Sequence, residues 1–137
     1  MSEKRYNSIK PGQVWLDTKG ERIQAHGGSV MEWEGYYYWY GENKEFTDRE
    51  KKIWHWGVRC YRSSDLYNWE DLGLIIPPNT EDPHSSLHPS SMMDRPHIIY
   101  NKKTGKFVCV STGSESTNNL SFCKEFLSSS RPAFSLG

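Results

Sequence analysis

The sequence has no excess of charge of either sign, and this argues against partners that are bound through a strong charge. Seventeen Lys and Arg residues balance seventeen Asp and Glu residues, so the formal net charge is zero. A neutral chain offers no basic field to gather the phosphates of a nucleic acid backbone. Nucleic acid is therefore not expected as a partner.

Paired cysteines and long apolar runs are also missing. The three cysteines, Cys60, Cys109 and Cys123, are widely spaced and contain no C-x-x-C pair, which argues against a disulfide framework and a zinc cage. No apolar run approaches the length of a membrane span, and no secretion-type hydrophobic segment follows the N-terminus. We expect a cytoplasmic chain without membrane contact.

Histidines at metal-ligand spacing are absent too. No acidic partners stand at ligand spacing from the histidines of the second half of the chain, His84, His88 and His97. We interpret all three as loop residues. The sequence therefore predicts neither a metal site nor another cofactor.

Aromatic residues are plentiful. They make up 14% of the chain, with six Trp and eight Tyr, whereas the whole hydrophobic share is only 35%. Large rings pack against the apolar faces of sugars while Asp, Glu, His and Asn bind hydroxyl groups. The same residue types also build ordinary β-strands, so composition alone leaves both interpretations open.

The residue pattern predicts an all-β chain with no long helix. Two aromatic and β-branched runs flank Glu34-Gly35, which is typical of a hairpin at 29–41, and a second hairpin is predicted at 96–110. A third strand is expected near 54–61, pairing with the first hairpin, and a short fourth strand ends before Pro77-Pro78.

The last part of the chain has a different composition. From 113 to 137 it is rich in Ser, Thr and Asn without a regular period, so we expect a weakly ordered tail. The strands before it follow the rhythm of four-stranded blades, with one blade complete and a second begun. The predicted organisation is one strand-rich unit at 1–112 followed by this tail.

Five short motifs in register give the sequence a family resemblance. They are Ile23–Gly28, Tyr38–Glu42, Gly57–Tyr61, Ser63–Trp69 and Asp94–Asn101. In this order they resemble the N-terminal part of glycoside hydrolase family 43, and the branch with exo-β-1,3-galactanases is the nearest. The resemblance implies a partial five-bladed β-propeller, and it ends after Cys109, where the sequence departs from the family pattern.

The resemblance also implies inverting hydrolysis of a plant-type glycan, a β-galactoside or a β-xyloside or arabinoside. Inversion needs an acid and a base roughly 6.5 to 9.5 Å apart. In the family, an Asp early in the first blade is usually the general base, and the Glu that acts as the general acid lies on a later blade. In this sequence, residues 24–28 contain no Asp. We therefore expect this stretch of chain to be inactive without a partner acid.

Two carboxylates match positions that face the substrate in that branch, and they are the candidate catalytic residues. Glu42 ends a predicted strand, and Asp94 stands where relatives often carry Glu before Arg-Pro. Strand ends beside loops are where a propeller places functional side chains. The alternatives are that Glu42 pairs with Arg59 or Lys44 at the surface and that Asp94 caps its own loop.

Four further residues are candidates for binding the sugar. Gln24 and His26 precede a Gly-Gly pair, Arg95 follows Asp94 in its motif, and Trp54 offers a ring. A lone His is more often a structural residue. Trp54 and Trp56 would share one strand face, where core packing is the more common use.

Two other classes of function remain open from the sequence. A non-catalytic carbohydrate-binding module would use the same aromatic strands and take an oligosaccharide or polysaccharide as its partner. A structural domain would instead self-associate through open blade faces and strand edges.

Overall fold

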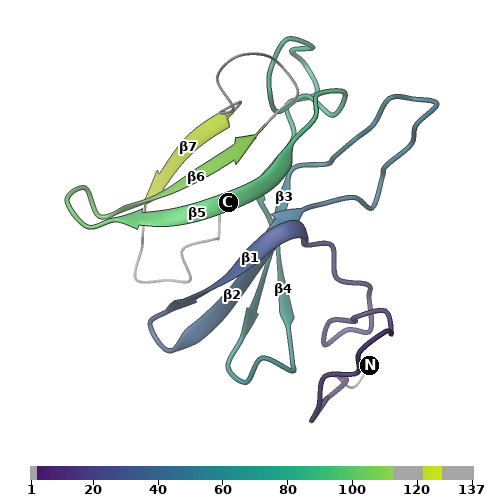
Figure 1. Cartoon of the computed structure of the whole chain (residues 1–137), viewed down its shortest axis with the longest axis vertical. Helices are drawn as coiled ribbons and strands as arrows, with labels where there is room; N and C mark the ends of the chain where they lie inside the picture. Colours follow the sequence, from purple (N-terminus) through teal and green to yellow (C-terminus); the bar gives the residue numbers. More distant parts are fainter. Residues whose placement is uncertain (1–2, 113–121, 128–137) are drawn as a thin grey trace.

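The computed structural model describes residues 3–112 and 122–127, which form seven strands in two antiparallel sheets (Figure 1). The first sheet has the order β1 (His26–Trp33), β2 (Tyr36–Glu42), β3 (Val58–Ser63) and β4 (Glu70–Ile76). The second has the order β5 (Asp94–Asn101), β6 (Lys106–Thr112) and β7 (Phe122–Leu127). Within these residues, no helix has the length and the apolar character needed to span a membrane. The all-β, partial-propeller prediction is confirmed.

The two predicted hairpins are present. β1 and β2 join at Glu34 and Gly35, which have φ angles of 49° and 80°. Positive φ at both central residues defines the turn that matches the twist of paired strands. β5 and β6 form the second hairpin, with Asn101 opposite Lys106.

The third strand begins later than predicted. β3 starts at Val58, so Trp54 and Trp56 lie in the preceding loop and the prediction of a strand from 54 is wrong. The amide of Trp54 donates to the carbonyl of Pro89 (2.8 Å), and that of Trp56 donates to Asn43 (2.8 Å). These amides bind loops and are therefore not part of a sheet ladder.

β7 lies inside the Ser-rich segment, where the pattern predicts no strand. It pairs with β6 from Lys106 opposite Leu127 to Ser111 opposite Phe122. Its side chains, and residues 113–121 and 128–137, lie outside what the structure describes. The domain boundary at 112 and the weak order of the tail stay predictions.

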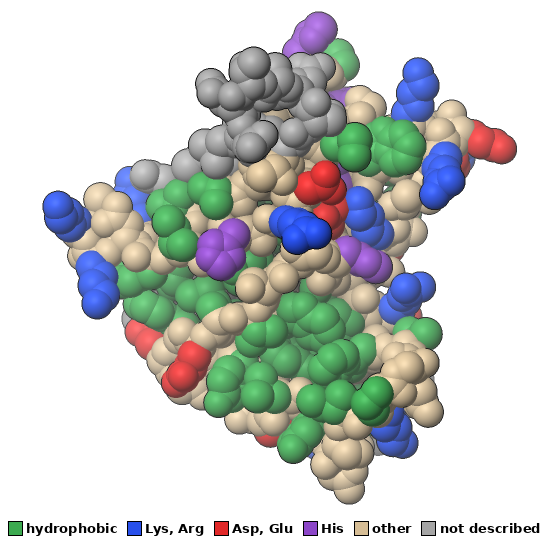
Figure 2. Space-filling model, in the orientation of Figure 1, with side chains coloured by type: hydrophobic (Ala, Val, Ile, Leu, Met, Phe, Trp, Pro, Cys, Tyr) green, Lys and Arg blue, Asp and Glu red, His purple; other side chains and the backbone are tan. Residues whose placement is uncertain are grey.

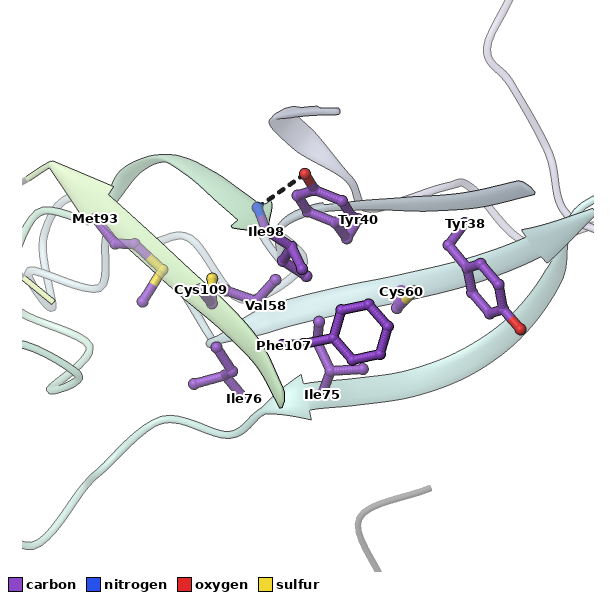
Figure 3. Close-up of a cluster of buried hydrophobic side chains, with 10 residues drawn as sticks. All are labelled: Tyr38, Tyr40, Val58, Cys60, Ile75, Ile76, Met93, Ile98, Phe107 and Cys109. Carbon is purple, nitrogen blue, oxygen red and sulfur yellow. Dashed lines mark hydrogen bonds between the residues drawn. The ribbon is translucent and has the colours of Figure 1, made fainter. Parts of the chain in front are cut away.

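The core lies between the two sheets, which Figure 3 shows in close-up. Alternate residues of a strand point to opposite faces, so Tyr38 and Tyr40 of β2 share a face with Cys60 of β3. These side chains pack with those of the second sheet, including Phe107, which is fully buried. The opposite face carries Trp39, which contacts Trp15 of the N-terminal segment edge-on at 4.8 Å and Trp69 at 5.3 Å.

One hydrogen bond crosses this core and joins the two sheets. β5 is an edge strand, and the amide of Ile98 donates to the hydroxyl of Tyr40 at 2.9 Å (Figure 3). Tyr40 is only 1% exposed, and burial raises the pKa of its hydroxyl, so the group keeps its proton at neutral pH. The bond satisfies a backbone amide that an edge strand would otherwise leave without a partner.

Removing this hydroxyl should destabilise the fold. We expect Tyr40→Phe to lower the free energy of unfolding by roughly 1 to 3 kcal/mol, because the Ile98 amide stays buried without an acceptor. Urea unfolding followed by fluorescence measures the difference. Tyr36→Phe is the matched control: Tyr36 lies on the same strand and is 42% exposed, and its ring contact with Arg62 does not need the hydroxyl. Equal losses in the two variants would contradict this account.

Candidate functional site

Three strand ends meet at one edge of the first sheet. Glu42 ends β2 opposite His26, which begins β1, and β5 begins beside them with Asp94 and Arg95. The amide of Arg95 donates to Oε1 of Glu42 at 3.4 Å. Figure 2 shows acidic, basic and histidine side chains gathered near the middle of one face of the molecule, above a hydrophobic surface.

Two glycines bring the backbone of β1 close to this carboxylate. The register of β1 with β2 shifts between His26 and Ser29, so Gly27 and Gly28 form an irregularity in the strand. A Cβ on Gly27 would lie 3.1 Å from Oε1 of Glu42, and a Cβ on Gly28 would lie 1.6 Å from the carbonyl oxygen of Tyr40. The Gly-Gly pair of the motif is therefore required by the close approach of two chains.

The Glu42 carboxylate is buried and partly compensated. Its residue is 4% exposed, and Nζ of Lys44 lies 2.5 Å from its Oε2 while also donating to the carbonyl of Trp54 at 2.8 Å. Within residues 3–112, Oε2 makes this ion contact but no hydrogen bond of regular geometry. The expected pairing with Lys44 thus exists, although beneath the surface. Arg59 pairs with Asp71 instead (2.6 Å).

His26 and Gln24 form a pair beside Glu42. Nε2 of His26 lies 2.9 Å from Oε1 of Gln24, whose own amide donates to the hydroxyl of Tyr61. Burial lowers the pKa of His26, and the charges of Arg22 and Lys44 lower it further, so the ring is neutral at pH 7. With Nε2 donating its proton to Gln24, Nδ1 is left as an acceptor.

Asp94 and Arg95 are exposed at the start of β5. The carbonyl of Asp94 accepts hydrogen bonds from the hydroxyls of Ser111 (2.8 Å) and Thr112 (3.1 Å). In residues 3–112 no hydrogen bond or ion pair involves its carboxylate, so the alternative of a loop cap has no support in the described contacts. Arg95 has a φ of 50°, which turns the chain before Pro96 and places its amide against Glu42.

In the described contacts, the ring of Trp54 does not touch the strand-end residues Glu42 and His26. Trp54 is half-buried in the loop before β3 and reaches the site through its carbonyl, which binds Lys44. The shared strand face of Trp54 and Trp56 was a wrong interpretation, because no strand is formed there. Trp56 packs edge-on against Phe46 at 5.3 Å. A sugar contact of Trp54 stays a prediction.

His55 is a residue of this region that the sequence analysis did not single out. It is fully buried, its Nδ1 accepts the amide of Gly57 (3.0 Å) and its Nε2 lies 3.0 Å from the carbonyl of His88. It thereby ties the loop before β3 to the Pro-rich loop before β5. His97, by contrast, lies in β5 opposite Val110, so its interpretation as a loop residue is wrong. No motif distinguishes His55 from the other histidines, so only burial reveals its role.

The site has no visible metal-binding geometry. In the part of the chain that the structure describes, no three His, Cys, Asp or Glu side chains are grouped as ligands. The functional groups of the site are carboxylates, an imidazole and a guanidinium, all of which can form hydrogen bonds with hydroxyl groups.

Neither a protein-family model nor a curated protein matches this sequence. Among solved structures, a family 43 β-1,3-galactosidase is 38% identical with a TM-score of 0.66, over 77% of this chain and 22% of that one. A second family 43 β-1,3-galactosidase, solved with galactodeoxynojirimycin, is 39% identical with a TM-score of 0.66, over 77% and 30%. This chain belongs to glycoside hydrolase family 43.

The galactanase-like branch of family 43 is represented as well. An exo-β-1,3-galactanase from Phanerochaete chrysosporium, solved with galactose, is 32% identical with a TM-score of 0.69, over 80% of this chain and 24% of that one. A glutamate-to-alanine variant of the same enzyme was solved with β-1,3-galactotriose. The chain spans less than a third of the length of each of these family 43 proteins.

The buried His55 should make stability depend on pH. Burial lowers the pKa of His55 to about 4 in the folded chain, whereas an unfolded His titrates near 6.5. The unfolded state thus binds more protons in this interval, and stability falls as the pH falls from about 6.5 towards 4. We expect about 2 kcal/mol of this loss between pH 7 and pH 4.5, measured by urea unfolding.

His55→Gln should show a smaller loss over the same pH range, because glutamine does not titrate. His26 shifts in the same direction, so the difference between wild type and variant isolates His55. His84→Gln, at an exposed position, is the control and should keep the wild-type slope. An unchanged slope in His55→Gln would refute the assignment.

Proposed function

We propose that this chain provides the first blade, with a galactose-binding carboxylate, of a glycosidase that acts on β-1,3-linked galactose. The observation that carries the proposal is Glu42. It is a carboxylate 4% exposed, fixed by Lys44 and the amide of Arg95 under a Gly-Gly segment. Solved relatives that this chain matches are β-1,3-galactosidases and galactanases, some of them with galactose or β-1,3-galactotriose.

The polar groups around Glu42 suit a sugar ring. A carboxylate is a strong acceptor for hydroxyl donors. Oε2 is buried against Lys44, so the oxygen with acceptor capacity for a sugar is Oε1, which receives only the long bond from the Arg95 amide. The neutral His26 adds a second acceptor through Nδ1, and the exposed guanidinium of Arg95 adds donors. Together they can bind neighbouring hydroxyls of one galactose and fix its orientation.

The roles of the two carboxylates follow from their surroundings. Glu42 contacts an ammonium and an amide, which hold its carboxylate in place, so we assign it to substrate binding and orientation. Asp94 is exposed at the start of the neighbouring blade and is the candidate to act on a water or a proton. A general acid on a further blade would complete inverting hydrolysis.

The 137-residue chain should therefore bind galactose without hydrolysing galactosides. Titration with galactose should shift the backbone amide signals of Gly27 and Arg95, since both residues lie next to Oε1 of Glu42. Glu42→Gln should weaken binding about tenfold or more, because a charge-assisted hydrogen bond is lost. Proton–nitrogen NMR gives both affinities.

Glu34→Gln, at the exposed turn on the other end of β1, is the matched control and should bind as the wild type does. Absence of galactose-induced shifts in the wild type would refute the binding site. Release of nitrophenol from an aryl β-galactoside that disappears in Glu42→Gln would refute the inactivity of the chain.

Self-association is a second candidate, favoured by apolar side chains on both sheets. Ile99 of β5 is 51% exposed and Val30 of β1 is 47% exposed. Sedimentation velocity over a concentration series tests this, and Ile99→Lys should reduce any dimer. A cytoplasmic location and the lack of nucleic acid or membrane partners stay predictions.

A further inference from the structure

Each of the two sheets has an outer face that points away from the core. On the first sheet this face carries Val30 and Trp39, which lie opposite each other in the ladder. On the second sheet it carries Ile99 and Val108, which are paired in the same way. Val30 is 47% exposed and Ile99 is 51% exposed, so both outer faces present apolar side chains to solvent.

The outer face of the first sheet is also hollowed. Trp39 and the N-terminal residues Val14 and Trp15 line an open hollow of about 390 Å³. Val14 is 62% exposed and Trp15 is 38% exposed, so the rim of the hollow extends the apolar surface that begins at Val30. A side chain from another sheet can be buried there, and burying apolar surface is what stabilises a contact between two sheets.

The packing inside the chain shows how two of its sheets fit together. Met31 of β1 packs against the buried cluster that contains Ile98 of β5. Trp33, at the end of β1, contacts Tyr100, near the end of β5, with ring centroids 4.4 Å apart. At the opposite end, the start of β5 reaches Glu42. The two sheets therefore have the same orientation, and the turns of their hairpins lie at the same end (Figure 1).

The turns of the two hairpins carry opposite charges. Glu32 and Glu34 lie at the turn of the first hairpin, and Lys102 and Lys103 lie at the turn of the second. All four residues are exposed, and within residues 3–112 none of them takes part in an ion pair. Because the chain has no net charge, two copies do not repel each other as wholes, and the turns supply a local attraction.

We propose that a second copy of this chain docks head to tail, with the outer face of its second sheet on the outer face of the first sheet. This contact repeats between copies the orientation that already joins the two sheets within one chain. Ile99 of one copy packs on Val30 and Trp39 of the other, and the lysine turn lies beside the glutamate turn. The docking rests on the self-association candidate, to which it gives a geometry, and it is independent of galactose binding at Glu42.

A contact between unlike faces differs from a symmetric contact between like faces in a way that can be measured. Each copy uses its first sheet on one side and its second sheet on the other, so the association closes as a ring or extends as a series of copies. Two defective variants can therefore complement each other if each supplies the face that the other needs.

The test is sedimentation velocity of the 137-residue chain at low salt over a concentration series. Wild type should associate. The double variant Glu32→Lys/Glu34→Lys makes both turns basic, and Lys102→Glu/Lys103→Glu makes both turns acidic, so each variant alone should associate about tenfold more weakly or less. An equimolar mixture of the two variants should recover the association, because every basic turn then meets an acidic one.

Glu50→Lys/Glu81→Lys is the matched control, because it makes the same change of charge at two exposed loop positions. It should associate as the wild type does. The docking is overturned if wild type stays monomeric at hundreds of micromolar, if the charge-reversal variants associate as wild type does, or if their mixture does not recover. A monomeric wild type also removes self-association, whereas a mixture that fails to recover removes only the head-to-tail geometry. Neither result changes the test of galactose binding.

Discussion

The hydroxyl of Tyr40 meets the amide of Ile98 inside the core, and the relation of the two sheets depends on this contact. β5 is an edge strand, so its outward amides need partners from another element. Tyr40 supplies one at 2.9 Å from a position 1% exposed. Because Ile98 is fixed, the start of β5 is held where the amide of Arg95 reaches Glu42.

At Glu42, the free-energy cost of burying a carboxylate is opposed by its attraction to Lys44 and by a hydrogen bond from Arg95. Burying a lone carboxylate costs several kcal/mol, and only a well-placed cation and hydrogen bonds offset this. Lys44 is close, but its side chain is 31% exposed, so solvent screens part of the attraction. The hydrogen bond from Arg95 is long, at 3.4 Å. The carboxylate is thus compensated enough to stay in place and still has capacity to accept hydroxyl donors.

Local signals in the sequence were enough to predict the hairpins and the class of fold. Glu34-Gly35 sets its own turn, and strand alternation needs no knowledge of distant residues. The position of Glu42 at a strand end followed from the same pattern. Its burial did not, because burial depends on β5, which is more than fifty residues away along the chain.

The sequence-based predictions failed where backbone contacts between residues far apart in the chain determine the local structure. The aromatic spacing of Trp54 and Trp56 suggested a strand, but their amides bind Pro89 and Asn43. His55 carries no motif, and only its burial against the Pro-rich loop reveals its role.

The strand order of the first sheet has a consequence for how the chain acquires its structure. β1 to β4 are neighbours both in space and in sequence, so this sheet needs only short loop closures and can form early during synthesis. Its buried face then already presents Tyr40 when the later residues arrive. We expect the first sheet to serve as a template on which the next blade is laid down, so the order of assembly follows the order of translation.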